Sequence, residues 1–254
     1  MSIVAVIPAR YGSSRFPGKP LAKATGKYLI QHVYERVCAC RRIDQVIIAT
    51  DDKRISRAAS EFSAPCIITN QNHPSGTDRI AEVAASLSAE IIINVQGDEP
   101  EVEPAALEIL IKRLKAEPEL AMATLARHFS KDEDPRDPNL VKVVLDDQDY
   151  ALYFSRSVIP HGRGCPAGTA EPGEYLLHLG IYGYRREFLL KFAAMGPSSL
   201  EKLEKLEQLR ALQAGTRIAV SVVSYLGAGI DTPEEYAAWV RSRKQHLPVT
   251  KEKD

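Results

Sequence analysis

The sequence predicts a fold of the α/β class, with a mostly parallel central sheet sandwiched by helices. Short, continuously apolar runs alternate with segments of helical periodicity through the first half of the chain, and this order is typical of parallel sheets buried on both faces. The chain has 254 residues, of which 44% are hydrophobic and 26% are charged. This length supports a substantial core, and the composition is that of a soluble globular protein. We therefore expect a single domain spanning residues 1–254.

The elements expected in the first half follow one another in alternation. Strands are expected at 3–7, 45–50, 65–69 and 90–96, and helices at 29–40, 55–62, 78–88 and 104–116. The helices are assigned from apolar residues that recur three and four positions apart. Ligands of such sheets bind beyond the carboxyl ends of the strands. The loops after the first, second and fourth strands are therefore expected to share one mouth.

The alternation breaks in the second half, where residues 121–185 are expected to form a smaller, β-rich insertion. Such insertions often form a small lobe or a dimer contact. Within it we expect a hairpin at 141–145 and 150–154, a Gly- and Pro-rich loop at 162–173, and a strand at 178–184. Beyond it we expect a helix at 200–214, a strand at 219–224, and a helix start at 231–234, with Asp231 or Thr232 as the N-cap.

Charge and cysteine usage exclude several classes of protein. Lys plus Arg and Asp plus Glu number 33 each, so no global field favours nucleic acid or an anionic membrane as a partner. No apolar run approaches the roughly 18–20 residues of a membrane helix, and the N-terminus lacks a signal-peptide pattern. The four cysteines have no zinc spacing. We expect a cytoplasmic protein that does not insert into membranes.

A segment rich in cations and small residues follows the first strand. Residues 7–21 contain Arg10, Arg15 and Lys19, with glycines and serines between them. A tightly turned backbone directs N–H groups toward an anion, and the cations add donors suited to phosphate oxygens. A Walker loop is excluded, because Pro20 stands where its metal-binding hydroxyl would be. The segment predicts a triphosphate site whose metal ligands come from elsewhere; the alternative is a basic surface loop.

Two aspartates follow apolar or Gly-rich segments that lead toward this mouth. Asp98 comes directly after the strand at 90–96, and Asp231 follows a Gly-rich approach at 227–230. Carboxylates there suit a Mg²⁺ ion that is shared with substrate phosphates. The alternatives are an acidic turn residue at Asp98 and a simple helix cap at Asp231.

The remaining polar positions carry less information by themselves. Residues 75–79 open a helix and either bind a base edge or a phosphate or form an ordinary cap. Arg156 ends a hairpin strand and suits a carboxylate clamp, although arginines at such positions are usually at the surface. Glu207 and Gln208 belong to a polar set of the kind that usually forms solvated ion pairs. A histidine such as His178 is more often a core residue than a ligand. No nucleophile is paired with a base, so covalent catalysis has no support.

Taken together, these motifs make the chain resemble the 3-deoxy-manno-octulosonate cytidylyltransferase (CMP-KDO synthetase) family. The resemblance runs from about residue 3 to about residue 235. Its blocks are 7–21, 49–52, 75–79, 94–100, 141–146, 151–160, 178–184, 206–210 and 231–234. The first and fifth blocks alone would also fit CMP-sialate synthetases, whereas the hairpin, the 178–184 block and the Glu207–Gln208 pair are more specific. The chain departs from the family pattern at 162–175 and in its tail.

The resemblance implies a fold and a reaction. The fold would be the Rossmann-like nucleotidyltransferase fold, with the insertion used for dimerisation. In the family reaction the anomeric hydroxyl of 3-deoxy-D-manno-octulosonate (KDO) attacks the α-phosphorus of CTP. Pyrophosphate leaves, and the CMP-KDO formed supplies lipopolysaccharide biosynthesis. A homodimer with CTP and KDO as substrates and Mg²⁺ as cofactor is therefore expected.

The resemblance also implies roles for individual residues. Nucleotide binding is implied for Arg10, Ser13, Arg15, Lys19, Ser75, Gly76, Thr77 and Arg79. Sugar binding is implied for Gln96, Arg156, His178, Tyr182, Glu207 and Gln208. Asp98 and Asp231 would ligate Mg²⁺, and the catalytic residues would be Arg10, Lys19 and Asp98.

Two alternatives to this function remain open at the level of sequence. The first is the same chemistry on another acid sugar, 8-amino-KDO or a sialic acid. The second is a non-catalytic sugar-nucleotide sensor, which would be free to lose Lys19, Asp98 and Asp231, although this chain keeps all three. A purely structural dimerising protein would leave the cation loop unexplained.

Overall fold

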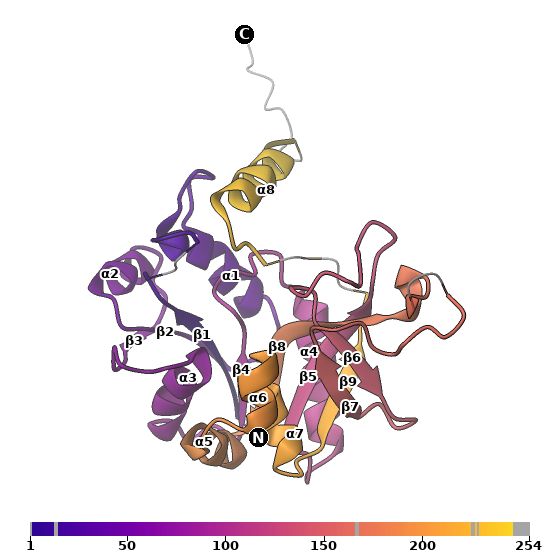
Figure 1. The fold of residues 1–254 in the computed structure, drawn as a ribbon. Helices are drawn as coiled ribbons and strands as arrows, with labels where there is room; N and C mark the ends of the chain where they lie inside the picture. Colours follow the sequence, from indigo (N-terminus) through magenta and orange to yellow (C-terminus); the bar gives the residue numbers. More distant parts are fainter. Residues whose placement is uncertain (1, 13–14, 166–167, 225–226, 228, 246–254) are drawn as a thin grey trace.

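The central sheet confirms the α/β class. A computed structural model describes residues 2–12, 15–165, 168–224, 227 and 229–245. The described strands are β1 (Ile3–Ala9), β2 (Gln45–Thr50), β3 (Cys66–Ile68), β4 (Ile91–Asn94), β5 (Met122–His128), β6 (Lys142–Leu145), β7 (Ala151–Ser155), β8 (Leu176–Arg185) and β9 (Ile218–Val222). They form one sheet in the order β3-β2-β1-β4-β8-β5-β9, and the β6–β7 hairpin joins it through β8 (Figure 1). Neighbours on this path pair in parallel except at β8, which is antiparallel to β4 and β5, so the predicted mostly parallel sheet is confirmed.

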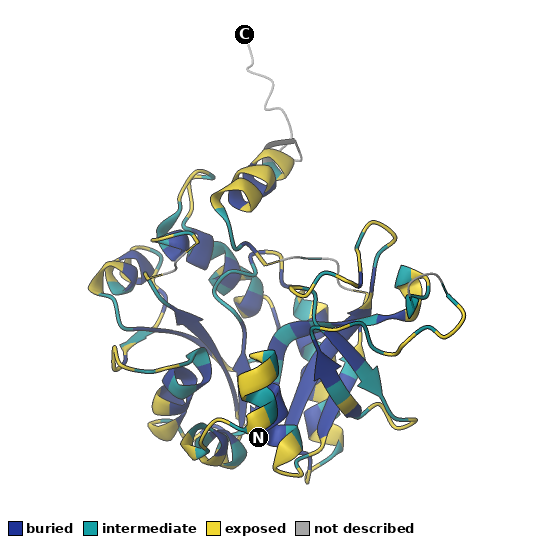
Figure 2. Cartoon of the chain, in the orientation of Figure 1, coloured by how far each residue is buried: buried dark blue, intermediate teal, exposed yellow. Residues whose placement is uncertain are grey.

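Helices cover both faces of the sheet. They are α1 (Leu29–Cys38), α2 (Lys53–Glu61), α3 (Gly76–Ala85), α4 (Pro104–Ala116), α5 (Arg186–Ala194), α6 (Ser199–Glu204), α7 (Gln208–Gln213) and α8 (Pro233–Gln245), with short 3₁₀ turns η1 (Lys19–Leu21) and η3 (Pro172–Glu174). On β1, Ile3, Ala5 and Ile7 pack in the cluster with α1, α2 and α4. Val4 and Val6 pack in the cluster with α3, α5 and α7. Both faces are therefore buried, which explains the continuously apolar strands (Figure 2).

The prediction of one helix at 200–214 is wrong, because the chain breaks there. α6 ends at Glu204, Lys205 adopts a left-handed conformation with φ 54°, and α7 begins at Gln208. The break directs Leu206 into the core, whereas Leu203 on α6 is 80% exposed. The helical spacing of the leucines continues across the break, so periodicity alone concealed it.

Two elements, β5 and α5 (Arg186–Ala194), were not anticipated from the sequence. β5 and α5 follow weak patterns, since β5 is buried from Met122 to Arg127 and shows no alternation of apolar and polar residues. Within the expected insertion at 121–185, β5 and β8 belong to the central sheet and β6–β7 lie off its path. The single domain and the use of the insertion for dimerisation stay predictions. None of the described helices combines the length and apolar character needed to cross a membrane.

Candidate functional site

The cation loop after β1 reaches two carboxylates from distant parts of the chain. The ammonium of Lys19 lies 2.7 Å from Asp98 Oδ2 and 3.2 Å from Asp231 Oδ1, and it donates to the carbonyl of Ile230 at 2.7 Å. Lys19 is only 8% exposed. A guanidinium nitrogen of Arg15 lies 2.8 Å from the other oxygen of Asp231. The structure thus brings together the expected phosphate-binding cations and the expected metal ligands.

A glycine makes this convergence possible. β1 and β4 run in parallel with Val6 opposite Asn94, so the loops that follow them leave the same edge of the sheet. A Cβ atom added to Gly97 would lie 2.8 Å from the carbonyl oxygen of Pro8. Real Cβ atoms essentially never approach that closely, so the close contact between the two loops requires glycine. Asp98 is held against the cation loop as a result.

The donor set at this point fits a divalent cation. Asp98 and Asp231 both contact the ammonium of Lys19, and Asp231 also pairs with Arg15. Mg²⁺ takes oxygen ligands and is often bound through one or two carboxylates, with water and substrate phosphate completing its shell. Among the described residues no group of three or more His, Cys, Asp or Glu side chains forms a metal site. Asp98 and Asp231 are therefore the two ligands that the described part of the protein offers to a metal ion. The binding of Mg²⁺ stays a prediction.

The N-terminus of α3 borders the same mouth. Ser75 caps the helix, and its side chain and that of Asp78 each accept from the other's backbone N–H at 3.1 Å. The ordinary capping interpretation therefore accounts for the hydroxyl of Ser75. Gly76 lies next to Pro8 of β1. The hydroxyl of Thr77 donates to the Glu207 carboxylate.

Two arginines lie at this helix: Arg79 belongs to it and is buried, whereas Arg10 comes from the loop after β1 and is only partly buried. Arg79 is fully buried, and it donates to Asp51 Oδ2 at 2.9 Å and to the hydroxyl of Thr69. Arg10 donates to the carbonyl of His73 at 3.0 Å. Burial and the nearby charge of Arg79 lower the pKa of Arg10. β1 and β2 pair in parallel with Ala9 opposite Thr50, so the loops that follow them leave the same edge of the sheet, as predicted. Ser13 lies outside the described residues.

Three expected sugar-binding residues come together through the pairing of β4 with β8. Asn94 is opposite Tyr182, and Gln96 donates to the carbonyl of Gly180 at 3.3 Å. The ring centroids of His178 and Tyr182 are 5.4 Å apart. Burial lowers the pKa of His178 to about 3 and raises the pKa of Tyr182. At neutral pH both side chains are therefore uncharged, and they can orient a ligand through hydrogen bonds.

The helix break places the next two expected residues at the start of α7. Glu207 accepts from Thr77, and burial raises the pKa of its carboxyl. Gln208 is buried, and its amide nitrogen finds no hydrogen-bond partner among the described residues. A buried donor without a partner is costly. This geometry supports a polar ligand at the start of α7.

Arg156 occupies a different kind of position. Its guanidinium donates to the carbonyls of Glu204 and Pro138, both at 2.7 Å. These bonds tie the end of α6 to the loop before β6. A role as a carboxylate clamp would require Arg156 to exchange them for the ligand, and that role stays a prediction.

Two cavities meet at Asp98. One, of about 220 Å³, is lined by Arg10, Lys19 and Gln96 on the side of the cation loop. The other, of about 520 Å³, is lined by His178 and Asp231 and extends toward β5 and β8. The two spaces suit a nucleotide phosphate and a second substrate that meet at one point.

Sequence reasoning missed two residues of the larger cavity. Arg127 on β5 is buried and holds Glu133 at 2.5 and 2.7 Å, and its Nε has no partner among the described residues. Burial and the adjacent Asp98 raise the pKa of Glu99 to about 8. An arginine directly after the mostly apolar run 122–126 was the available signal for Arg127. Glu99 lay in the 94–100 block with no role assigned.

Comparisons with known proteins agree on one family. Residues 4–218 match the family model described as cytidylyltransferase. The 3-deoxy-manno-octulosonate cytidylyltransferase of Syntrophotalea carbinolica is 48% identical over 239 residues, which cover 92% of this chain and 96% of that protein. The enzyme of the same name from Pelobacter propionicus is 50% identical over 241 residues, covering 92% and 94%.

Solved structures show the same likeness. The CMP:2-keto-3-deoxy-manno-octonic acid synthetase, complexed with CTP, superposes with a TM-score of 0.91 at 44% identity and covers 97% of this chain and 100% of its own. A 4-diphosphocytidyl-2C-methyl-D-erythritol synthase from Anaerococcus prevotii superposes with a TM-score of 0.61 at 13% identity, covering 96% of this chain and 99% of its own. The second likeness concerns the fold alone.

Proposed function

This chain belongs to the cytidylyltransferase family, and we propose that it transfers CMP from CTP to the anomeric hydroxyl of KDO, giving CMP-KDO and pyrophosphate for lipopolysaccharide biosynthesis. The observation that carries the proposal is the meeting of Lys19, Asp98 and Asp231 where the two cavities join. The reaction needs cations and carboxylates at that point and no protein nucleophile.

The residues around the smaller cavity bind and position the triphosphate. Negative charge develops on the non-bridging and leaving oxygens in the transition state, so pre-placed cations stabilise it. Arg10 and Lys19 line this cavity and supply those charges. When the nucleotide binds, Lys19 exchanges its bonds to the carboxylates for bonds to phosphate oxygens. A Mg²⁺ ion held by Asp98 and Asp231 supplies further charge neutralisation when bound.

The residues around the larger cavity orient the acid sugar. His178 stays neutral because burial lowers its pKa to about 3, so it contributes a hydrogen bond and moves no proton. The sugar carboxylate needs a cation, and the cavity is lined by two arginines, Arg15 and Arg127. Arg15 is paired with Asp231. Arg127 keeps an Nε–H without a partner among the described residues, and we assign it to the carboxylate.

We also propose that the protein works as a Mg²⁺-dependent homodimer in the cytoplasm. Leu152 on β7 is 62% exposed and Val222 on β9 is 41% exposed. Apolar side chains at this edge of the sheet would be covered by a second copy. Size-exclusion chromatography with light scattering tests the dimer, and a monomer at micromolar concentration contradicts it.

The function is tested by measuring pyrophosphate release with CTP, Mg²⁺ and KDO. Parallel reactions contain 8-amino-KDO or a sialic acid as acceptor, and UTP replaces CTP as a control. We expect release with KDO and CTP. Pyrophosphate release only with another acid would support the same mechanism with a different sugar substrate. CTP binding without pyrophosphate release from any of the three acids would favour the sugar-nucleotide sensor.

A further inference from the structure

Helix α8 begins at one of the two carboxylates of the site. The carboxylate of Glu235 accepts from the backbone N–H groups of Asp231 at 2.6 Å and of Thr232 at 3.0 Å. The hydroxyl of Thr232 accepts in return from the N–H of Glu235 at 3.2 Å. This reciprocal cap makes the backbone of Asp231 part of the first turn of α8. A displacement of α8 therefore displaces Asp231.

A small apolar cluster holds α8 against the cation loop. Tyr236, Trp239 and Val240 are buried on one side of the helix, while much of its remaining surface is exposed (Figure 2). Tyr236 lies with its ring centroid 5.7 Å from that of Phe16, and its hydroxyl accepts from the N–H of Ala24 at 2.8 Å. Phe16 and Ala24 flank Lys19 in sequence, so Tyr236 ties α8 to the cation loop.

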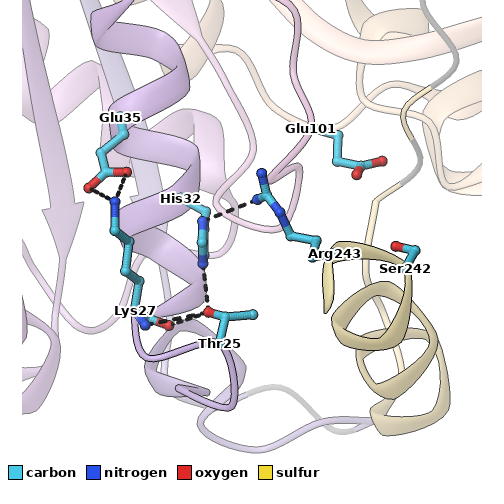
Figure 3. Close-up of a pocket in the computed structure, with 7 residues that line it drawn as sticks. All are labelled: Thr25, Lys27, His32, Glu35, Glu101, Ser242 and Arg243. Carbon is cyan, nitrogen blue, oxygen red and sulfur yellow. Dashed lines mark hydrogen bonds and ion pairs between the residues drawn. The ribbon is translucent and has the colours of Figure 1, made fainter. Parts of the chain in front are cut away.

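Trp239 ties the same helix to the loop that contains Asp98. Its indole N–H donates to Glu101 Oε1 at 3.2 Å, three residues beyond Asp98. Its ring lies 5.0 Å from that of His32 on α1, and His32 accepts from Arg243 at 3.3 Å. Figure 3 shows His32, Glu101 and Arg243 at a cavity between α1 and α8. The volume of this cavity is about 550 Å³. A single helix thus contacts both loops that supply the expected metal ligands.

We propose that α8 is a clasp that sets the separation of Asp98 and Asp231, with Tyr236 and Trp239 as positioning residues. Lys19 joins the two carboxylates in the structure. When a ligand takes the place of Lys19, both carboxylates shift, and α8 follows because it is tied to both loops. The apolar cluster that holds α8 in place is small, so each of its aromatic contacts contributes a large part of the free energy that holds the helix there. The inference rests on the proposed function only in taking this point as the triphosphate and metal site.

Trp239 is the only tryptophan of the chain, so the intrinsic emission of the native protein tests the clasp without turnover. The protein is titrated with Mg²⁺ alone, with CTP alone and with both. We expect the emission to shift with both ligands together. In Tyr236→Phe, which loses only the hydroxyl, half-saturation should need about three- to tenfold more Mg²⁺, the size of one hydrogen bond.

The matched control is Tyr34→Phe. Tyr34 lies on α1 with its ring 5.7 Å from that of Phe62, away from α8, and this variant should titrate as the native protein does. If calorimetry detects CTP binding in the presence of Mg²⁺ while the emission of Trp239 stays constant, the clasp is overturned and the proposed function stands. If the emission responds to CTP while no acceptor releases pyrophosphate, the clasp stands and the proposed reaction is overturned.

Steady-state kinetics supply a second readout. Trp239→Phe keeps an aromatic ring and loses the N–H that reaches Glu101. The Mg²⁺ concentration for half-maximal pyrophosphate release should rise about three- to tenfold and kcat should fall, with the KM for KDO unchanged. Glu101→Ala should behave in the same way, and Glu101→Gln, which keeps an acceptor oxygen, should restore native values. If Trp239→Phe lowers Tm and leaves the Mg²⁺ dependence of pyrophosphate release unchanged, α8 contributes only to stability and the clasp is overturned.

Discussion

Replacing Lys19 by methionine tests whether its ammonium fills a cation position between two carboxylates. Methionine has a similar length and no charge. In Lys19→Met the carboxylates of Asp98 and Asp231, which Lys19 contacts at 2.7 and 3.2 Å, would face each other with their shared cation removed. The carbonyl of Ile230 would also lose its 2.7 Å bond to the ammonium.

The structure sets the size of the effect. Removing one partner of a fully buried ion pair costs about 3–5 kcal/mol. The side chains of Asp98 and Asp231 are 30% and 45% exposed, so water screens part of this repulsion. We expect a loss of about 2 kcal/mol, which for a domain of this size lowers Tm by roughly 4–8 °C. Mg²⁺ should restore more stability to the variant than to the native protein, because the two carboxylates are then free to bind it.

The assay is thermal unfolding in EDTA and in Mg²⁺, with pyrophosphate release measured in parallel. Activity should fall by about 10²–10³, the usual cost of removing one group that stabilises transition-state charge. Lys23→Met is the matched control, because Lys23 forms an exposed ion pair with Glu61 at 3.5 Å. Its Tm should change little. Equal gains in Tm from Mg²⁺ in Lys19→Met and the native protein would refute the reasoning, as would native stability of Lys19→Met in EDTA.

Three further changes test other parts of the site. Asp98→Asn should reduce kcat by orders of magnitude while circular dichroism shows the fold intact, and retained turnover would remove Asp98 from the catalytic residues. Gly97→Ala should destabilise the protein by about 1–3 kcal/mol in urea unfolding, because the added Cβ would lie 2.8 Å from the Pro8 carbonyl; native stability would show that the loops can separate. Burial and the charge of Arg243 lower the pKa of His32 from 6.5 to about 4. Between these two pH values the unfolded chain therefore binds more protons at His32 than the folded protein does. The free energy of unfolding should fall as the pH drops from 6.5 to 4, by at most about 3 kcal/mol. His32→Gln should reduce the change in the free energy of unfolding over this pH range. An unchanged pH dependence in the variant would show that other groups cause it.

Local pattern was enough for much of the fold and part of the site. β2 and α4 have the bounds that apolar runs and helical spacing predict. The cap at Ser75 and the helix start at Thr232 were also predictable, because a capping residue and its partner lie within four positions of each other. The cation loop after β1 is likewise a local pattern of glycines and long cationic side chains.

The sequence by itself determined which residues carry the chemistry, and only the tertiary structure decided which of them meet. Lys19 contacts Asp98 across 79 positions and Ile230 across 211, and no local pattern encodes such distances. The break at Lys205, which places Glu207 at the start of α7, arises because Leu206 turns into a core built from other elements. The tie between Trp239 and the loop of Asp98 has the same origin. Patterns report contacts within a few residues, whereas the site is made where separate strands and one late helix end at a common edge.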